Sequence, residues 1–260
     1  MRLGVISDVH GNLIALRRVL EHLRTQGVDR VVNLGDCVSA PLWPRETLEL
    51  LQELGAVTVR GNHDRWLGDA HRCATQPTVT FTREQLDDSD VVTLTSLPAT
   101  AEIVTGVLAV HGTPTSDTDY LLEEAIDDRL CLVTTDTLDR RLEHVTAELI
   151  LCGHSHLQHV AWASDGRLVI NPGAVGAPRY AGNAAPWANE AGSPHARCAI
   201  ATENHGRWSV DLFALDYDWQ SVARRAQSVG RADWAAAFTK GAPRARTPRT
   251  NGDPTAPPFA

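Results

Sequence analysis

The chain of 260 residues contains one lysine, one methionine and five cysteines, and aromatic residues make up 5% of it. The cysteines are odd in number and no two are separated by two residues, so neither a disulfide framework nor a structural zinc knuckle is expected. Hydrophobic runs are strand-sized and fall short of the ~20 residues that a membrane-spanning helix needs. The first residues lack the pattern of a secretion signal. These absences predict a cytoplasmic protein without a membrane segment.

Basic residues are fewer than acidic ones, 24 against 32, so the formal net charge is −8 at pH 7. A folded domain of this charge repels a nucleic-acid backbone unless it carries a local basic patch. The sequence has no stretch that is both basic and rich in aromatic residues. A nucleic-acid partner and a nuclease activity are therefore disfavoured, and no oligomeric state is predicted.

Apolar residues are spread along the chain as far as about residue 238, which predicts one domain over residues 1–238. Residues 239–260 are rich in Pro, Arg, Thr and Gly and are expected to form a disordered tail. Within the domain, residues 113–145 show helical patterns with many acidic side chains, among them Asp117 and Glu123. We interpret them as a lid over the site, with a solvated acidic surface as the alternative.

The first 64 residues repeat one pattern three times: a short apolar run, a polar turn and a helical pattern. The apolar runs predict buried strands at residues 3–6, 31–34 and 57–59, and the helical spacing predicts helices at residues 13–23 and 47–54. Later segments predict strands at residues 103–110, 149–152, 168–170, 196–202 and 208–213, and a closing helix at residues 219–237. This order is typical of a mostly parallel α/β sheet, whose active site lies beyond the carboxyl ends of the strands.

Polar side chains gather where these predicted strands end, at one edge of one sheet. The set holds two carboxylates, one amide and five imidazoles: Asp8, His10, Asp36, Asn62, His63, His111, His154 and His156. Imidazole and carboxylate together suit Mn, Fe, Zn or Co. The donors outnumber what one ion needs, so they predict two ions that share a bridging carboxylate.

Each motif is weak when it stands alone. A single DxH or Gly-Asp pair is usually a turn, GHSH is often an ordinary polar loop, and NHD is often a turn with a helix cap. Their joint occurrence in this order favours the metal site over these ordinary interpretations.

The series DVHGN, LGDCV, RGNHD, VHGTP and CGHSH, over about residues 1–180, resembles the calcineurin-like metallophosphoesterase superfamily. DVHGNLIAL and NPGAVGAPR are most similar to its bacterial and archaeal branch of small phosphodiesterases and diadenosine-polyphosphate hydrolases. The resemblance implies an α/β fold, a four-layer α/β/β/α sandwich. The sequence departs from close relatives at Ser39-Ala40-Pro41, where a glycine and an aromatic are expected. This departure is expected to alter the pocket rim without touching a ligand.

The resemblance also implies seven ligands for two divalent ions. Manganese is expected, and the same donors accept Fe, Zn, Co or Ni. For one ion the implied ligands are Asp8, His10 and His156, for the other they are Asn62, His111 and His154, and the bridge is Asp36.

Four residues have expected roles toward the substrate. By the resemblance, His63 faces the leaving group, and its imidazolium would protonate the departing alkoxide. Asp64 would either orient His63 or cap a helix, and both interpretations stay open. The amide of Asn62 would neutralise the phosphate oxygens. Arg179 would bind phosphate or would be an ordinary surface arginine.

The expected reaction is hydrolysis of a small phosphate ester. Two ions would trap a bridging water and lower its pKa toward neutrality, so that hydroxide attacks phosphorus in line with the leaving oxygen. The expected enzyme is a phosphodiesterase that acts on small nucleotide-like or other diesters. A phosphomonoesterase or protein phosphatase would use the same site. A non-catalytic scaffold on the same fold is disfavoured because all seven ligands are present.

Overall fold

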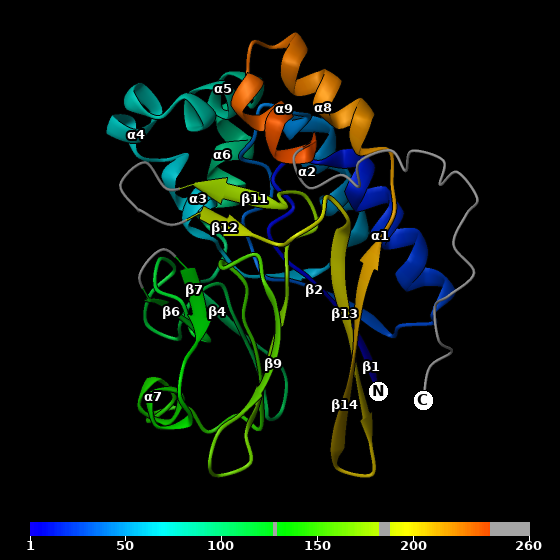
Figure 1. The fold of residues 1–260 in the computed structure, drawn as a ribbon, viewed down its shortest axis with the longest axis vertical. Helices are drawn as coiled ribbons and strands as arrows, with labels where there is room; N and C mark the ends of the chain where they lie inside the picture. Colours follow the sequence, from blue (N-terminus) through cyan, green and yellow to red (C-terminus); the bar gives the residue numbers. More distant parts are fainter. Residues whose placement is uncertain (127–128, 182–187, 240–260) are drawn as a thin grey trace, which may run out of the picture.

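The computed structural model describes residues 1–126, 129–181 and 188–239 and contains two five-stranded sheets. The strand orders are β14-β13-β1-β2-β3 and β4-β5-β8-β10-β9. In Figure 1 the layers follow one another from right to left as helix α1, the sheet of β1, β13 and β14, the sheet that contains β9, and helix α7. The predicted α/β/β/α sandwich is confirmed.

The first sheet joins parallel strands near the N-terminus to an antiparallel pair near the C-terminus. Its strands are β1 (Arg2–Ile6), β2 (Arg30–Asn33), β3 (Val57–Thr58), β13 (Ala196–Asn204) and β14 (Arg207–Leu215). β1 pairs in parallel with β2 and β2 with β3, whereas β13 runs antiparallel to β1. The three parallel strands therefore point their carboxyl ends to the same side of the sheet.

The two helices predicted beside this sheet are present, although the first ends two residues later and the second begins three residues earlier than the sequence predicts. In α1 (Leu13–Thr25) the side chain of Asn12 accepts a hydrogen bond from the N–H of Ala15 at 3.1 Å, which caps the first turn. Helix α2 (Pro44–Leu54) starts at a proline and ends at Gly55, whose φ of 62° is the left-handed conformation that glycine adopts easily. The apolar faces of both helices pack on the sheet in one buried cluster.

The second sheet has three parallel strands between two antiparallel edge strands. They are β4 (Thr100–Val104), β5 (Val107–Val110), β8 (Leu149–Leu151), β9 (Gln158–Trp162) and β10 (Leu168–Pro172). The single strand predicted at residues 103–110 is wrong. The chain reverses at Gly106, where φ is 82°, and β4 and β5 pair as an antiparallel hairpin.

Three buried clusters separate the layers. One fills the space between the first sheet and its helices, and a second, with Leu3 and Leu151, lies between the two sheets. The third covers the outer face of the second sheet with Leu138 of α7 (Thr135–Arg141). Among the described residues, no helix is long and apolar enough to cross a membrane.

Other segments differ from the predictions. Residues 113–145 contain the hairpin of β6 (Glu123–Ile126) and β7 (Arg129–Leu132) as well as α7, so they are not mainly helical. The predicted closing helix is two helices, α8 (Trp219–Ser228) and α9 (Ala232–Thr239), because the chain turns at Gly230 with φ of 80°. The predicted tail lies outside the described residues from residue 240 onward. Other elements that the sequence did not indicate are β9 in the second sheet and α3 (Asn62–Trp66), α4 (Ala70–Thr75), α5 (Pro77–Gln85), α6 (Asp88–Thr95), β11 (Arg179–Ala181) and β12 (Ala188–Glu190).

The last described helix is held by Phe238, whose side chain is fully buried in the cluster beneath α1 and α8. We expect Phe238→Ala to lower the free energy of unfolding by about 3–5 kcal/mol, because it leaves a cavity in a closed core. Equilibrium urea denaturation measures the change. The control is Val92→Ala, at a side chain that is 62% exposed, and it should stay within about 0.5 kcal/mol of the parent. A loss below about 1 kcal/mol for Phe238→Ala would contradict this packing.

Candidate metal centre

The polar residues singled out in the sequence come from the carboxyl ends of parallel strands in both sheets. They follow β1 (Asp8 and His10), β2 (Asp36), β3 (Asn62 and His63), β5 (His111) and β8 (His154 and His156). The prediction of one edge of one sheet is therefore wrong. The sandwich brings the strand ends of two sheets together, and the site lies where those ends meet.

The side chains form two clusters of possible metal donors. The first cluster is Asp8, His10 and His156, and the second cluster is Asp36, His111 and His154. Within each cluster the donor atoms all lie within 4.8 Å of one another. Asp36 faces both, because its Oδ2 is 3.5 Å from Nε2 of His111 and 3.7 Å from Nε2 of His10. A carboxylate placed in this way can be shared by two ions.

Most of these residues have an unusual backbone conformation. Five of the six have φ between 46° and 68°: Asp8, His10, Asp36, His154 and His156. Non-glycine residues rarely adopt this left-handed region, at a cost of about 1–3 kcal/mol each, and such strain is concentrated at functional sites. Backbone hydrogen bonds hold these residues in the left-handed conformation. One of them runs from the N–H of His10 to the carbonyl of Asp36 at 2.9 Å.

The histidine rings are oriented by backbone carbonyls. In three rings Nδ1 lies 2.7–2.9 Å from a carbonyl oxygen, which fixes the proton on Nδ1 and turns Nε2 toward the cluster. The pairs are His10 with Ser39, His111 with Leu34, and His156 with Ala177. His154 is reversed: its Nε2 lies 3.0 Å from the carbonyl of Thr118, so Nδ1 is the atom left for a metal. Ser39 thus contacts a ligand, contrary to the expectation for residues 39–41.

These orientations fit a cation. Because Nδ1 of each ring faces a backbone carbonyl, the Nε2 atoms of His10 and His156 point toward each other across 3.3 Å. Oδ1 of Asp8 is buried 3.3 Å from Nε2 of His156 and accepts no hydrogen bond from the residues that the structure describes. In the second cluster, Nε2 of His111 lies within hydrogen-bonding distance of Oδ1 of Asn62, at 3.0 Å. Nitrogen and oxygen atoms that converge in this way need a proton or a metal ion between them.

The electrostatics of the bare protein point the same way. Burial alone would raise the pKa values of Asp8 and Asp36, yet the neighbouring histidines hold both pKa values below the usual aspartate range. Burial opposes charge on His111, but the carboxylate of Asp36 raises the pKa of His111 to about 10. A proton therefore sits where the geometry offers a place for a metal ion, and metal binding would displace it.

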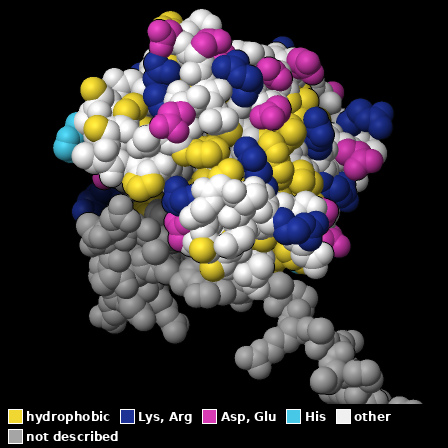
Figure 2. All heavy atoms as spheres, turned by 90° about the horizontal axis from the view of Figure 1, so that it is seen from above, with side chains coloured by type: hydrophobic (Ala, Val, Ile, Leu, Met, Phe, Trp, Pro, Cys, Tyr) yellow, Lys and Arg dark blue, Asp and Glu magenta, His cyan; other side chains and the backbone are white. Residues whose placement is uncertain are grey.

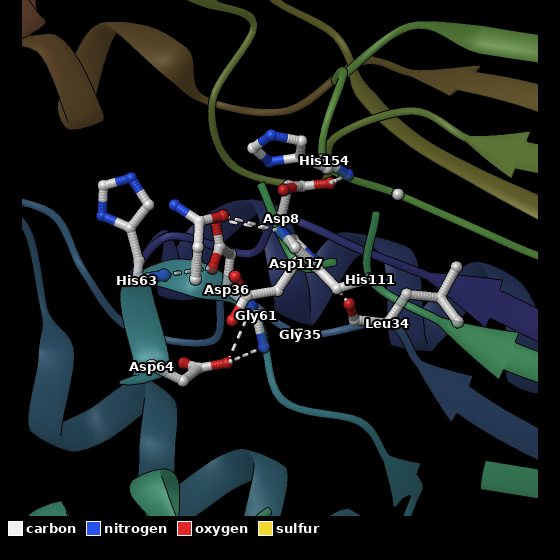
Figure 3. A network of polar contacts seen from close by, with 12 residues as sticks. Asp8, Leu34, Gly35, Asp36, Gly61, His63, Asp64, His111, Asp117 and His154 are labelled. Atoms are coloured by element: carbon white, nitrogen blue, oxygen red, sulfur yellow. Dashed lines mark hydrogen bonds and ion pairs between the residues drawn. The ribbon is translucent and has the colours of Figure 1, made fainter. Parts of the chain in front are cut away.

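His63 lies beside the clusters on α3, near Asp36 (Figure 3). Its backbone N–H donates to Oδ1 of Asp36 at 2.8 Å, and its ring centroid is 4.4 Å from that of Trp66. Nδ1 of His63 is buried and has no hydrogen-bond partner among the described residues. Burial lowers the pKa of this imidazole to about 3, although the charge of Asp36 acts in the opposite direction.

Asp64 binds backbone rather than the imidazole of His63. Its carboxylate accepts from the N–H groups of Asp36 at 2.8 Å, Cys37 at 2.9 Å and Gly61 at 2.9 Å. No hydrogen bond to the His63 ring is present among the described residues. The geometry therefore favours the helix cap of the two interpretations left open, and it does not support a catalytic contact. Asp64 fastens the turn before α3 to the turn after β2.

Other expected and unexpected residues surround the centre. Arg179 begins β11, and its side chain lies outside the described residues. The ring of Tyr120 stacks on that of His154 with centroids 4.9 Å apart, a contact that no sequence motif indicated. From the predicted lid, Asp117 binds Arg65 through two hydrogen bonds of 2.7 Å, next to α3. Glu123 is 1% exposed, so it is not part of a solvated acidic face.

Gly61 is expected to be essential although it holds no metal. A Cβ built on it would lie 2.1 Å from Oδ1 of Asp36 and 2.4 Å from the backbone nitrogen of Asp36, and backbone cannot move aside cheaply. We expect Gly61→Ala to displace Asp36 and weaken metal binding by at least about tenfold, as measured by competition with a chelating dye. Gly68→Ala is the matched control, because its Cβ would come closest to the methyl group of Thr95, at 3.1 Å, and would lie 3.6 Å from the carbonyl oxygen of Arg65. Unchanged metal affinity in Gly61→Ala would show that this close approach is not needed.

Residues 1–186 match the family model of the calcineurin-like phosphoesterase superfamily domain. An uncharacterized protein of Methanocaldococcus jannaschii, MJ0912, is 29% identical over 209 residues, which are 71% of this chain and 80% of that protein. A metallophosphoesterase from Sphaerobacter thermophilus is 27% identical, and the match covers 90% of this chain and 100% of that chain with a TM-score of 0.68. The hypothetical protein PH1004 from Pyrococcus horikoshii OT3 has a similar fold, with 20% identity and a TM-score of 0.70 over 90% of this chain and 95% of that chain. The chain belongs to the calcineurin-like phosphoesterase superfamily and is a metal-dependent phosphoesterase.

Proposed function

We propose that the chain is a two-metal phosphodiesterase that hydrolyses small nucleotide-like or other diesters. The observation that carries this proposal is the position of Asp36, whose Oδ2 lies within 3.7 Å of a histidine nitrogen in each cluster. Sharing one carboxylate is how a protein places two ions close enough to act on one phosphate. Manganese is the metal we expect, and Fe, Zn, Co and Ni suit the same donors.

The ligand roles follow the two clusters. The first cluster would hold one ion, and His111, His154 and Oδ1 of Asn62 would hold the other, with Asp36 between them. Ions bound here would supply the Lewis acidity that activates water for attack and neutralises phosphate charge. The amide nitrogen of Asn62 would add a hydrogen bond to a phosphate oxygen.

His63 is proposed as the general acid for the leaving group. Its partly exposed ring lies against Trp66, with Nδ1 free of a hydrogen-bond partner among the described residues. The pKa of His63 is about 3 in the protein without substrate, so its imidazolium form needs a negative charge beside it. The substrate phosphate would supply that charge. On this account His63 gains its proton when substrate binds and passes it to the departing alkoxide.

The charges near the site support a diester rather than a monoester. A diester carries one negative charge, whereas a monoester carries close to two at neutral pH and needs more positive side chains around it. Arg65, the arginine that follows His63 and Asp64, is engaged by Asp117. On the face that Figure 2 shows, arginine side chains are interspersed with Asp and Glu side chains, so this face offers no continuous basic surface to a long polyanion.

We further propose that part of residues 113–145 shapes substrate choice as a lid. The carbonyl of Thr118 contacts His154, and the pair of Asp117 with Arg65 ties this segment to α3 beside His63. These two contacts support a lid whose first third borders the metal centre. In the hairpin of β6 and β7, Glu123 contacts the loop that carries His154 and His156 through Ser155.

The shared carboxylate gives the first functional test. We expect Asp36→Asn to lose most bound metal and nearly all hydrolysis of bis-nitrophenyl phosphate, because the amide carries no charge to share between two ions. Metal analysis and initial rates measure both losses. Asp216→Asn removes the same charge at an exposed position and should leave both unchanged. An Asp36→Asn protein with two ions and normal turnover would show that Asp36 does not bridge.

His63 gives the second test, through the leaving group. His63→Ala should keep two metal ions and lose roughly 10²–10⁴-fold in rate on an alkyl or nucleoside diester, whose alkoxide needs a proton. It should lose far less on a nitrophenyl diester, whose phenolate departs without one. Exposed His144→Ala serves as the control. Equal losses on both esters together with a missing ion would make His63 a ligand instead.

A further inference from the structure

Glu123 is a carboxylate buried behind the metal centre that plays no part in the proposed chemistry. It begins β6 in the predicted lid, and its side chain is 1% exposed. Burying a carboxylate costs several kcal/mol unless specific partners compensate for the lost water. Its partners are the hydroxyl of Ser155, at 2.8 Å, and His159, whose Nε2 is 3.6 Å away.

Ser155 stands between the two histidine ligands of the second sheet. It is fully buried, and its neighbours on either side, His154 and His156, have φ of 68° and 61°. The two histidines belong to different clusters, so one short loop contributes a donor to each proposed ion. A change in the conformation of this loop would therefore alter the ligands of both proposed ions.

The hydroxyl of Ser155 is the centre of a closed polar network. It accepts hydrogen bonds from Nδ2 of Asn171 at 3.0 Å and from the N–H of Leu157 at 3.4 Å. Nδ2 of Asn171 also donates to the carbonyl of Gly153 at 2.8 Å. Because the oxygen of Ser155 already accepts twice, its own proton is directed to Oε1 of Glu123. Glu123 is therefore the acceptor that completes the network.

The backbone around Glu123 is itself fixed. The guanidinium of Arg141, at the end of α7, donates to the carbonyls of Leu121 at 2.9 Å and Glu123 at 3.0 Å. The start of β6 thus has a defined position relative to the second sheet. From this position the carboxylate contacts the loop through the hydroxyl of Ser155.

We propose that Glu123 is a positioning residue for the metal centre. Through Ser155 it holds residues 153–156 in the strained conformation that aims His154 at the second cluster and His156 at the first. This inference rests on the proposed two-metal function. It gives the predicted lid a second role, because the segment that borders the substrate side also fixes ligands for both ions.

The test measures metal affinity directly, by competition of purified full-length protein with a chelating dye for Mn²⁺. Glu123→Ala and Ser155→Ala should each weaken binding of both ions by roughly 10–100-fold, the usual effect of losing an outer hydrogen-bond partner. The double variant should be no weaker than Ser155→Ala alone, because Ser155→Ala already removes the hydrogen bond to Glu123. Glu123→Gln should bind metal nearly as well as the parent, since its carbonyl oxygen still accepts from Ser155. Circular dichroism establishes that each variant is folded at the assay temperature.

Glu124→Ala is the matched control, because it removes the same charge from the adjacent position, where the side chain is not buried. Parental affinity for both ions in Glu123→Ala and Ser155→Ala would overturn the proposal. Glu123→Gln binding as weakly as Glu123→Ala would also overturn it, because charge rather than positioning would then be responsible. A parent chain that binds no divalent metal would instead overturn the proposed function, and this inference with it.

Discussion

Two groups of buried nitrogen and oxygen acceptors face each other across the carboxylate of Asp36, and the rest of the structure depends on what neutralises them. The Nε2 atoms of His10 and His156 are 3.3 Å apart, and Oδ1 of Asp8 is buried beside them without a hydrogen bond from the described part of the chain. Without a metal ion, the carboxylate of Asp36 raises the pKa of His111 to about 10, so a proton on His111 balances part of the buried negative charge. Divalent cations would balance this charge more fully and would leave every histidine neutral, as ligation requires.

The fold supplies this concentration of charge and holds it against strain. Parallel strands from two sheets end on the same side, so short turns deliver donors from five strand ends to one place. The left-handed backbone at five of the six clustered residues costs free energy that the buried clusters between the layers must outweigh. Two buried carboxylates hold these turns in place. Asp64 accepts hydrogen bonds from three backbone N–H groups, and Glu123 accepts one from the hydroxyl of Ser155.

Local patterns in the sequence predicted much of this arrangement. Short apolar runs that end in polar residues located β1, β2 and β8, and each of the seven expected ligands lies at or beside the two clusters. The reversal at Gly106 was missed because a two-residue turn between apolar stretches resembles an interrupted strand. Contacts between segments that are distant in the sequence could not be predicted from local patterns either. Nothing near residue 123 indicates that its carboxylate meets Ser155, and the backbone role of Asp64 depends on a turn 28 residues earlier.

The central claim is that two ions share Asp36, and anomalous diffraction from crystals grown with Mn²⁺ tests it most directly. The account predicts two anomalous peaks within about 4 Å of each other, one beside Asp8, His10 and His156 and the other beside His111 and His154, with Asp36 between them. A single peak at full occupancy, or two peaks that do not both contact Asp36, would contradict the account.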